Sequence, residues 1–165
     1  MISNFDLEIM KLAFKEAENS LANKRKVGAV IVVNNNDNYN QTFGPQMFCG
    51  YNKMFQQLKV SPTCENEFGE TFECVIHAEE MAIMTMLKTD IKKTSTIYVT
   101  YSPCMNCCKL IAHAGITRVV YYDVHHINFN QPEIKGGYSP ANFLEQMGIV
   151  VERIYDLNIL DNNEK

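Results

Sequence analysis

The chain has 165 residues, 46% of them hydrophobic and 21% charged, which predicts one globular domain spanning residues 1–165. Fifteen Lys and Arg residues against nineteen Asp and Glu residues give a formal net charge of −4. This balance disfavours a general nucleic-acid-binding protein, which neutralises phosphates with many cations, but it permits a small phosphorylated ligand that needs only a few local cations.

The pattern of apolar residues predicts an alternation of helices and strands. Ser3 and Asn4 can cap a first helix, in which apolar residues recur at helical spacing from Phe5 to Leu21. Further helices are expected over 77–87, 104–114 and 139–147, and strands over 27–33, 47–51, 97–101, 119–122 and 149–154. Residues 34–40 are expected to form a hairpin tip, and 53–74 and 123–138 to form long loops. The strand–helix–strand order of the second half predicts parallel strands with helices on the sheet faces.

The location of the protein is inferred from its apolar segments and its cysteines. No stretch reaches the roughly 18 consecutive apolar residues that a membrane helix requires. The N-terminus contains Asp6 and Glu8 and does not resemble a signal peptide. We therefore expect no membrane partner and a cytoplasmic location, where thiols stay reduced. Cys104, Cys107 and Cys108 fall within five positions, which favours a metal or redox site over a disulfide framework.

Two short motifs at predicted helix starts carry the chemistry. The first is H-A-E at 77–79, and the second is P-C-M-N-C at 103–107. One His and two Cys leave the fourth position of a tetrahedral zinc ion open for water, and zinc lowers the pKa of that water to about 7. Glu79 can then move protons between the water and a substrate nitrogen. H-x-E followed by P-C-x-x-C is the signature of zinc deaminases, so Zn²⁺ is the expected cofactor.

Each motif alone has a simpler interpretation. H-A-E is common on helix surfaces, and C-x-x-C also occurs in structural zinc sites and in redox proteins. A thioredoxin-like role is disfavoured because Pro103 precedes the first cysteine and no aromatic-rich pattern accompanies it. The two motifs together, in this order and each opening a helix, favour the catalytic interpretation.

The sequence resembles the deoxycytidylate (dCMP) deaminase family over most of its length. The similar segments are K-R-K-V-G-A-V at 24–30, G-Y-N at 50–52, Y-V-T-Y-S-P-C at 98–104, G-I-T-R-V-V-Y at 115–121 and M-G-I-V-V at 147–151. The resemblance implies an α/β fold of the cytidine-deaminase type: a three-layer α/β/α sandwich with a five-stranded mixed sheet whose last two strands are parallel. It also implies zinc-dependent hydrolysis of dCMP to dUMP, which supplies thymidylate synthesis, and a homo-oligomer, commonly a hexamer.

The resemblance also assigns roles to individual residues. It makes His77, Cys104 and Cys107 the zinc ligands and Glu79 the proton shuttle. It places Asn52 against the sugar, the backbone at Ala29 near the pyrimidine, and Ser102 beside the amino group that leaves.

Two features beside the first strand allow alternative interpretations. Gly28 lacks a side chain and so permits close approach of a ring, and a strand glycine packed under a helix is the alternative. Lys24, Arg25 and Lys26 form the densest basic cluster and suit a phosphate, although a solvated cationic turn has the same composition.

The match departs from the family pattern in places. The family's G-Y-N-G-x-P-x-G becomes G-Y-N followed by residues 53–58 without glycine or proline, so this loop must take another path. Cys49, Cys64 and Cys74 are candidates for a second, structural metal site, but the ligand set looks incomplete, and buried inert thiols are the alternative. Cys108 is expected to point away from the zinc.

Other functions remain open at this stage. A related deaminase could act on dCTP, on cytidine or deoxycytidine, or on adenosine or cytidine in tRNA or single-stranded nucleic acid. The acidic charge and the single basic cluster disfavour the nucleic-acid substrates, so no nucleic-acid partner is expected. A non-catalytic zinc module is disfavoured by Glu79, because a structural site needs no adjacent base and prefers a fourth protein ligand.

Overall fold

The computed structural model describes residues 1–34, 44–55, 57–58, 63–86, 94–123, 129–130 and 137–157. The helices are α1 (Asn4–Ala17), α2 (Ala78–Met86), α3 (Met105–His113) and α4 (Pro140–Gln146). The strands are β1 (Gly28–Val33), β2 (Gln46–Tyr51), β3 (Ser95–Tyr101), β4 (Arg118–Asp123) and β5 (Val150–Arg153). Nearly all of the expected hairpin tip at 34–40, the last residue of the helix expected over 77–87 and most of the expected loop 123–138 lie outside the described residues.

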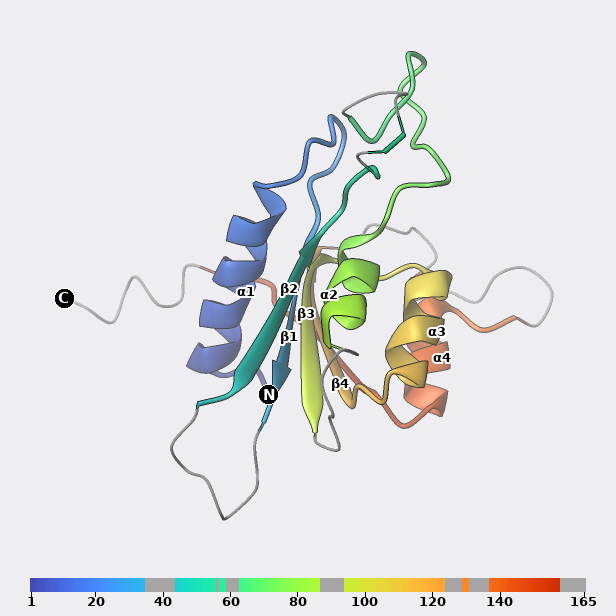
Figure 1. Cartoon of the computed structure of the whole chain (residues 1–165). Coiled ribbons are helices and arrows are strands. Elements are labelled where there is room, and N and C mark those ends of the chain that lie inside the picture. Colours follow the sequence, from blue (N-terminus) through green and yellow to red (C-terminus); the bar gives the residue numbers. More distant parts are fainter. Residues whose placement is uncertain are drawn as a thin grey trace.

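The strands form one mixed sheet in the order β2-β1-β3-β4-β5. β1 is antiparallel to both β2 and β3, whereas β3, β4 and β5 run parallel to one another. α1 covers one face of the sheet, and α2, α3 and α4 lie on the other (Figure 1). The three-layer sandwich with parallel last strands is therefore confirmed. Within the described residues, no helix has the length and apolar character needed to span a membrane.

The first helix begins as predicted but buries a different stripe. Ser3 caps α1 in a reciprocal capping box with Asp6. The buried stripe starts at Asp6 and continues through Met10 and Ala13, so it excludes Phe5, which is 47% exposed. Leu21 follows the end of the helix and is 62% exposed. The predicted helix therefore extends four residues too far, and Phe5 lies off its buried stripe because a buried carboxylate takes the inward position of the first turn.

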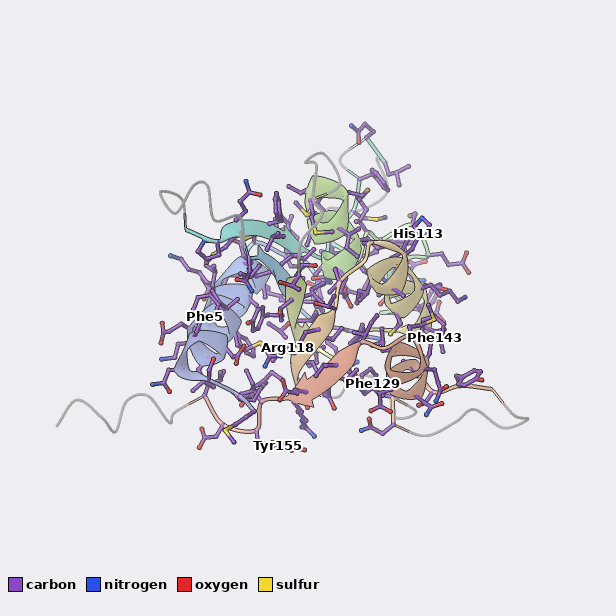
Figure 2. The ribbon with its side chains drawn as sticks, turned by 90° about the horizontal axis from the view of Figure 1, so that it is seen from below. Phe5, His113, Arg118, Phe129, Phe143 and Tyr155 are labelled. Carbon is purple, nitrogen blue, oxygen red and sulfur yellow. The ribbon has the colours of Figure 1, made fainter. Side chains whose placement is uncertain are left out.

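Asp6 is buried because it joins α1 to the sheet through charged hydrogen bonds. Arg118 of β4, which lies between α1 and the strands in Figure 2, donates to Asp6 Oδ1 at 2.5 Å. The Tyr98 hydroxyl on β3 donates to the same oxygen at 2.6 Å. Burial opposes ionisation of Asp6, but these donors and Ser3 outweigh it and hold the pKa of the carboxyl well below its usual range.

Asp6→Asn is expected to lower the free energy of unfolding by about 3 kcal/mol, because it leaves Arg118 with one fewer carboxylate in a largely buried site. The pKa of Asp6 is depressed in the folded state, so its stabilisation is present above about pH 4 and is lost as the pH falls below that value. Urea denaturation at pH 7 and at pH 3 should show the gap between wild type and variant narrowing in acid. The exposed Glu8→Gln on the same helix is the control and should change stability by less than about 0.5 kcal/mol. An equal loss at both pH values would contradict the prediction.

Two glycines, at the start of β1 and near the end of β2, let helices pack directly against the sheet close to the cavity described below. A Cβ on Gly28 would lie 1.9 Å from the carbonyl oxygen of Ala13 and 2.7 Å from the amide nitrogen of Ala17. On β2, a Cβ on Gly50 would lie 2.3 Å from the carbonyl oxygen of Ala78. Gly28 thus faces α1, and packing under a helix accounts for it without a ligand.

Candidate active site

A cavity of about 630 Å³ opens at the carboxyl end of β3, where the N-termini of α2 and α3 and the segment before β1 meet. It is lined by Lys24, Arg25, Val27, Asn52, Glu65, Thr71, Val75, His77, Ala78, Glu79, Tyr101, Ser102 and Cys104. Its volume falls in the range of small-molecule sites, and the carboxyl ends of parallel strands are where open α/β sheets bind ligands.

Three potential metal ligands converge at this cavity. His77 directly precedes α2, and its backbone nitrogen donates to the Glu80 side chain at 2.8 Å, which fixes the start of the helix. Its Nδ1 lies 3.3 Å from Cys107 Sγ and 3.7 Å from Cys104 Sγ. Zinc bond lengths and tetrahedral angles require nitrogen–sulfur separations of about 3.6 Å, so the three donors fit a zinc ion as they stand. Among the described residues, no other His, Cys, Asp or Glu group meets the geometry of a metal site.

The electrostatics of the two cysteines favour a thiolate. Cys104 is the N-cap residue of α3, and Cys107 lies one turn into the helix. Cys107 donates a hydrogen bond to Cys104, which with His77 lowers the pKa of Cys104 to about 3 and raises the pKa of Cys107. The hydrogen bond with Cys104 raises the pKa of His77 to about 9. Thiolate is the ligating form of cysteine, so the apoprotein already holds one ligand in the state that a metal needs.

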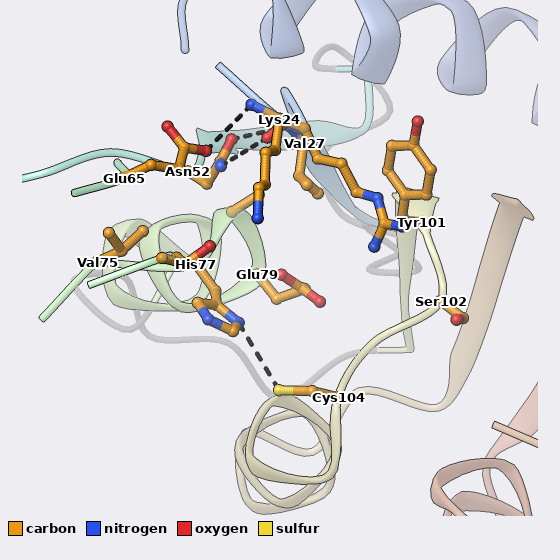
Figure 3. Close-up of a pocket in the computed structure, with 13 residues that line it drawn as sticks. Lys24, Val27, Asn52, Glu65, Val75, His77, Glu79, Tyr101, Ser102 and Cys104 are labelled. Atoms are coloured by element: carbon orange, nitrogen blue, oxygen red, sulfur yellow. Dashed lines mark hydrogen bonds between the residues drawn. The ribbon is translucent and has the colours of Figure 1, made fainter. Parts of the chain in front are cut away.

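Glu79 lies beside the donors in the first turn of α2, with its carboxylate directed into the cavity (Figure 3). The residue is only 4% exposed. Burial raises the pKa of its carboxyl to about 7, partly offset by a hydrogen bond from its own backbone amide and by His77. A carboxyl with a pKa near neutrality both accepts and releases protons readily, which suits a proton shuttle.

The residues predicted to contact substrate fall into two groups. Lys24, Arg25 and Ser102 line the cavity. Lys26 is exposed and Ala29 is fully buried in β1 between Gly50 and Val99, and neither lines the cavity. The assigned contacts with sugar, base and phosphate stay predictions.

Asn52 also lines the cavity, and its amide braces the chain before β1. Asn52 Oδ1 accepts a hydrogen bond from the Val27 backbone nitrogen at 2.8 Å, and Nδ2 donates to the Arg25 carbonyl oxygen at 2.9 Å. The Ser20 hydroxyl donates to the Asn52 carbonyl oxygen at 2.8 Å. Asn52 therefore supports the basic segment whether or not it contacts a sugar.

The structure does not bring Cys49, Cys64 and Cys74 together as a second metal site. Cys49 packs on the α1 side of the sheet, Cys64 is buried in a separate apolar cluster, and Cys74 is exposed. Burial raises the pKa of Cys64, as in an inert thiol. Cys108 is buried with its sulfur 3.8 Å from the Pro103 carbonyl oxygen, so it points away from the donors as expected.

Several cavity residues escaped the sequence reasoning: Val27, Glu65, Thr71, Val75 and Tyr101. Tyr101 belongs to the strand that ends at the P-C-x-x-C motif, and the Arg25 guanidinium lies 5.9 Å from the centre of its ring. Glu65 lies 14 residues before Glu79 in sequence, in a segment without helical or strand periodicity. The available signal was the C-E-N-E segment at 64–67, which resembles the family but carries no assigned role.

Comparison with known proteins gives consistent matches. Residues 3–123 match the family model described as the cytidine and deoxycytidylate deaminase zinc-binding region. The deoxycytidylate deaminases of Pongo abelii and Homo sapiens are each 37% identical to the chain over 123 residues, which cover 71% of this chain and 64% of each relative. The chain thus aligns with just under two thirds of their length. Deoxycytidylate deaminase of Mycobacterium phage D29 is 31% identical over 72% of this chain and 94% of that relative.

A solved structure extends the match beyond the family model. The crystal structure of dCMP deaminase from the cyanophage S-TIM5, in complex with dCMP and dUMP, superposes with a TM-score of 0.74 at 28% identity. The superposition covers 93% of this chain and 99% of that chain. The likeness therefore extends past residue 123, where the match to the family model ends.

Proposed function

Because the chain belongs to the cytidine and deoxycytidylate deaminase family, we propose that it hydrolyses dCMP to dUMP and ammonia, a reaction that supplies dUMP for thymidylate synthesis. The observation that carries the proposal is the cavity in which a buried Glu79 adjoins the His77, Cys104 and Cys107 donors while Lys24 and Arg25 lie on its wall. The S-TIM5 enzyme bound to dCMP and dUMP and the named deoxycytidylate deaminases support this choice of substrate.

The reaction adds water to C4 of the pyrimidine and breaks the bond from C4 to the amino nitrogen. His77, Cys104 and Cys107 would hold a zinc ion, which would lower the pKa of a bound water towards neutrality. Glu79 accepts one proton as water adds to C4 and delivers it to the ring nitrogen N3. It then accepts the remaining proton of the new C4 hydroxyl and delivers it to the amino nitrogen, so that ammonia leaves and the C4 carbonyl of dUMP forms. The carboxylate returns to its starting charge when ammonia leaves. The buried position of Glu79 keeps these protons from exchanging with bulk solvent during the step.

Lys24 and Arg25 are expected to make dCMP a better substrate than deoxycytidine. A hydrogen bond between a phosphate and a charged donor contributes about 1.5–3 kcal/mol, or roughly 10- to 150-fold in kcat/KM. Steady-state rates on both compounds measure the ratio of kcat/KM for dCMP to that for deoxycytidine. Lys24→Met should reduce this ratio mainly by weakening the binding of dCMP. Lys26→Met removes an equal charge outside the cavity and should reduce the ratio less. Equal efficiency on nucleoside and nucleotide would exclude a phosphate site and would indicate a cytidine deaminase.

The experiment that tests the function itself is a panel of single-substrate assays. Purified protein is offered dCMP, dCTP, deoxycytidine, cytidine and tRNA, and ammonia release is followed. Turnover of dCMP above the others supports the proposal, whereas preferred turnover of tRNA or dCTP replaces it with another deaminase activity. Zinc binding without turnover of any of them would indicate a non-catalytic zinc module.

We also propose a homo-oligomer, a hexamer by family resemblance, that works in the cytoplasm. Phe55 and Leu58, in the loop that departs from the family pattern, are 47% and 39% exposed and offer apolar surface to another copy. None of the six cysteines forms a disulfide, which suits a reducing compartment.

A further inference from the structure

The carboxylate of Glu65 is bound to the backbone of the basic segment at 23–25. Glu65 is 5% exposed. Its Oε2 accepts a hydrogen bond from the Asn23 backbone nitrogen at 2.8 Å, and its Oε1 accepts one from the Lys24 backbone nitrogen at 3.1 Å. Hydrogen bonds to an ionised acceptor are stronger than neutral ones, so this pair holds the two residues firmly.

Glu65 is itself held in place by the turn that contains it. It forms an isolated bridge with Thr71, and Phe72 donates from its backbone to the Cys64 carbonyl oxygen at 3.0 Å. Cys64 anchors this turn in an apolar cluster with Met54 and Val75. The carboxylate is thus presented by a braced turn.

The same segment is fastened at its other end by Asn52. As described above, the Asn52 amide binds the Arg25 carbonyl oxygen and the Val27 backbone nitrogen. Residues 23–27 therefore have four backbone hydrogen bonds to two side chains from distant parts of the chain, and Figure 3 shows Glu65 and Asn52 side by side at this wall of the cavity. A loop fixed in this way holds its side chains in place before a ligand arrives, which reduces the entropy lost on binding.

The two cations of this segment that line the cavity, Lys24 and Arg25, are available to an anion. In the described part of the chain, neither Lys24 nor Arg25 forms an ion pair with a carboxylate. The Lys24 side chain points into the cavity above Glu79 (Figure 3), and the Arg25 guanidinium lies over the ring of Tyr101. Glu65 binds the backbone of the basic segment and leaves the charged ends of these side chains unneutralised.

We propose that Glu65 is a positioning residue for nucleotide specificity: it fixes residues 23–25 so that Lys24 and Arg25 meet the 5′-phosphate of the substrate. The inference rests on the proposed function. It assigns Glu65 no contact with substrate and no part in proton transfer. Its effect should therefore appear only with a phosphorylated substrate.

The test is Glu65→Gln, assayed with dCMP and with deoxycytidine. The substituted amide has one oxygen for two backbone donors, so the basic segment loses its fixed position. We expect KM for dCMP to rise about tenfold with kcat unchanged, the signature of lost binding rather than lost chemistry, and the constants for deoxycytidine to stay as in wild type. Glu67→Gln makes the same charge change at an exposed position two residues away and should leave both substrates unaffected.

The charge change alone predicts the opposite effect on KM for dCMP. Removing a negative charge near the cavity attracts a phosphate more strongly, so an unchanged or lowered KM for dCMP would overturn the proposal. An equal loss on dCMP and deoxycytidine would also overturn it, because it would indicate contact with the sugar or base, or general damage.

A second variant tests whether Glu65 acts through the cations. In a Lys24→Met/Arg25→Met background, adding Glu65→Gln should lower kcat/KM for dCMP little further. If Glu65 and the two cations acted independently, their effects on kcat/KM would instead be additive in free energy. Thermal unfolding of each variant separates positioning from misfolding. If the wild type deaminates deoxycytidine as efficiently as dCMP, or deaminates neither compound, the proposed function fails and this inference fails with it. If the wild type prefers dCMP and Glu65→Gln keeps that preference, only the inference fails.

Discussion

Glu79→Gln is expected to keep its zinc while kcat on dCMP falls by roughly 10²–10⁴-fold, the usual contribution of a positioned general acid–base group. The amide has nearly the same volume as the carboxyl, so the buried site and the three donors should keep their arrangement. An amide neither accepts nor releases a proton near neutral pH, so the variant keeps the attacking water but lacks the group that moves its protons. Metal analysis of the purified variant and single-turnover rates measure the two effects separately.

The control for this variant is Glu73→Gln, which removes a carboxylate at an exposed position six residues away. It should leave both zinc content and kcat as in wild type. Glu79→Ala should behave as Glu79→Gln does in retaining metal. Near-wild-type turnover in either Glu79 variant would rule out the mechanism, because no other carboxylate among the cavity residues adjoins the three donors.

The pH dependence follows from the environment of the same carboxyl. Burial raises the pKa of Glu79 to about 7, and only the ionised form can accept a proton from water. A zinc ion beside the carboxyl would lower this pKa, because its charge favours the carboxylate. The wild-type kcat/KM should therefore fall in acid, with its midpoint below pH 7. The residual activity of Glu79→Gln should lack this acid limb.

Much of the fold could be predicted because its signals are local. The β-branched run of β1 and the alternation of strands and helices after residue 77 indicated a sheet covered by helices, and the register bears this out. The orientation of α1 could not be predicted in the same way. An aromatic residue at position 5 is exposed while Asp6 is buried, because Arg118 and Tyr98 lie opposite, and they are more than ninety residues away in sequence.

The residues of the candidate site also fall into those with a local sequence signal and those without one. His77, Glu79, Cys104 and Cys107 belong to two motifs with fixed spacing, so their types and order alone indicated a metal site with an adjacent base. Glu65 belongs to no such motif. Its significance lies in hydrogen bonds to residues 41 and 42 positions earlier, and only the folded chain makes those contacts.

Cys104→Ser is expected to lose both zinc and activity, which distinguishes a ligand from the proton shuttle. Serine has the shape of cysteine but is not readily ionised, whereas Cys104 has a pKa of about 3 and is already a thiolate. Zinc content should fall from about one per chain to near zero, and kcat/KM should fall by more than roughly 10⁴-fold because the activated water is lost with the metal. His77→Ala should give the same result.

Metal content in Cys104→Ser also reports on a second site. Cys49, Cys64 and Cys74 lie on different sides of the structure, so no zinc should remain once the His77 site is broken. Cys74→Ser removes an exposed thiol and is the matched control, with metal and turnover expected as in wild type. About one zinc per chain retained by Cys104→Ser would mean either that Cys104 is not a ligand or that a second site exists. The double variant Cys104→Ser/His77→Ala separates these outcomes, since only a second site survives the loss of both donors.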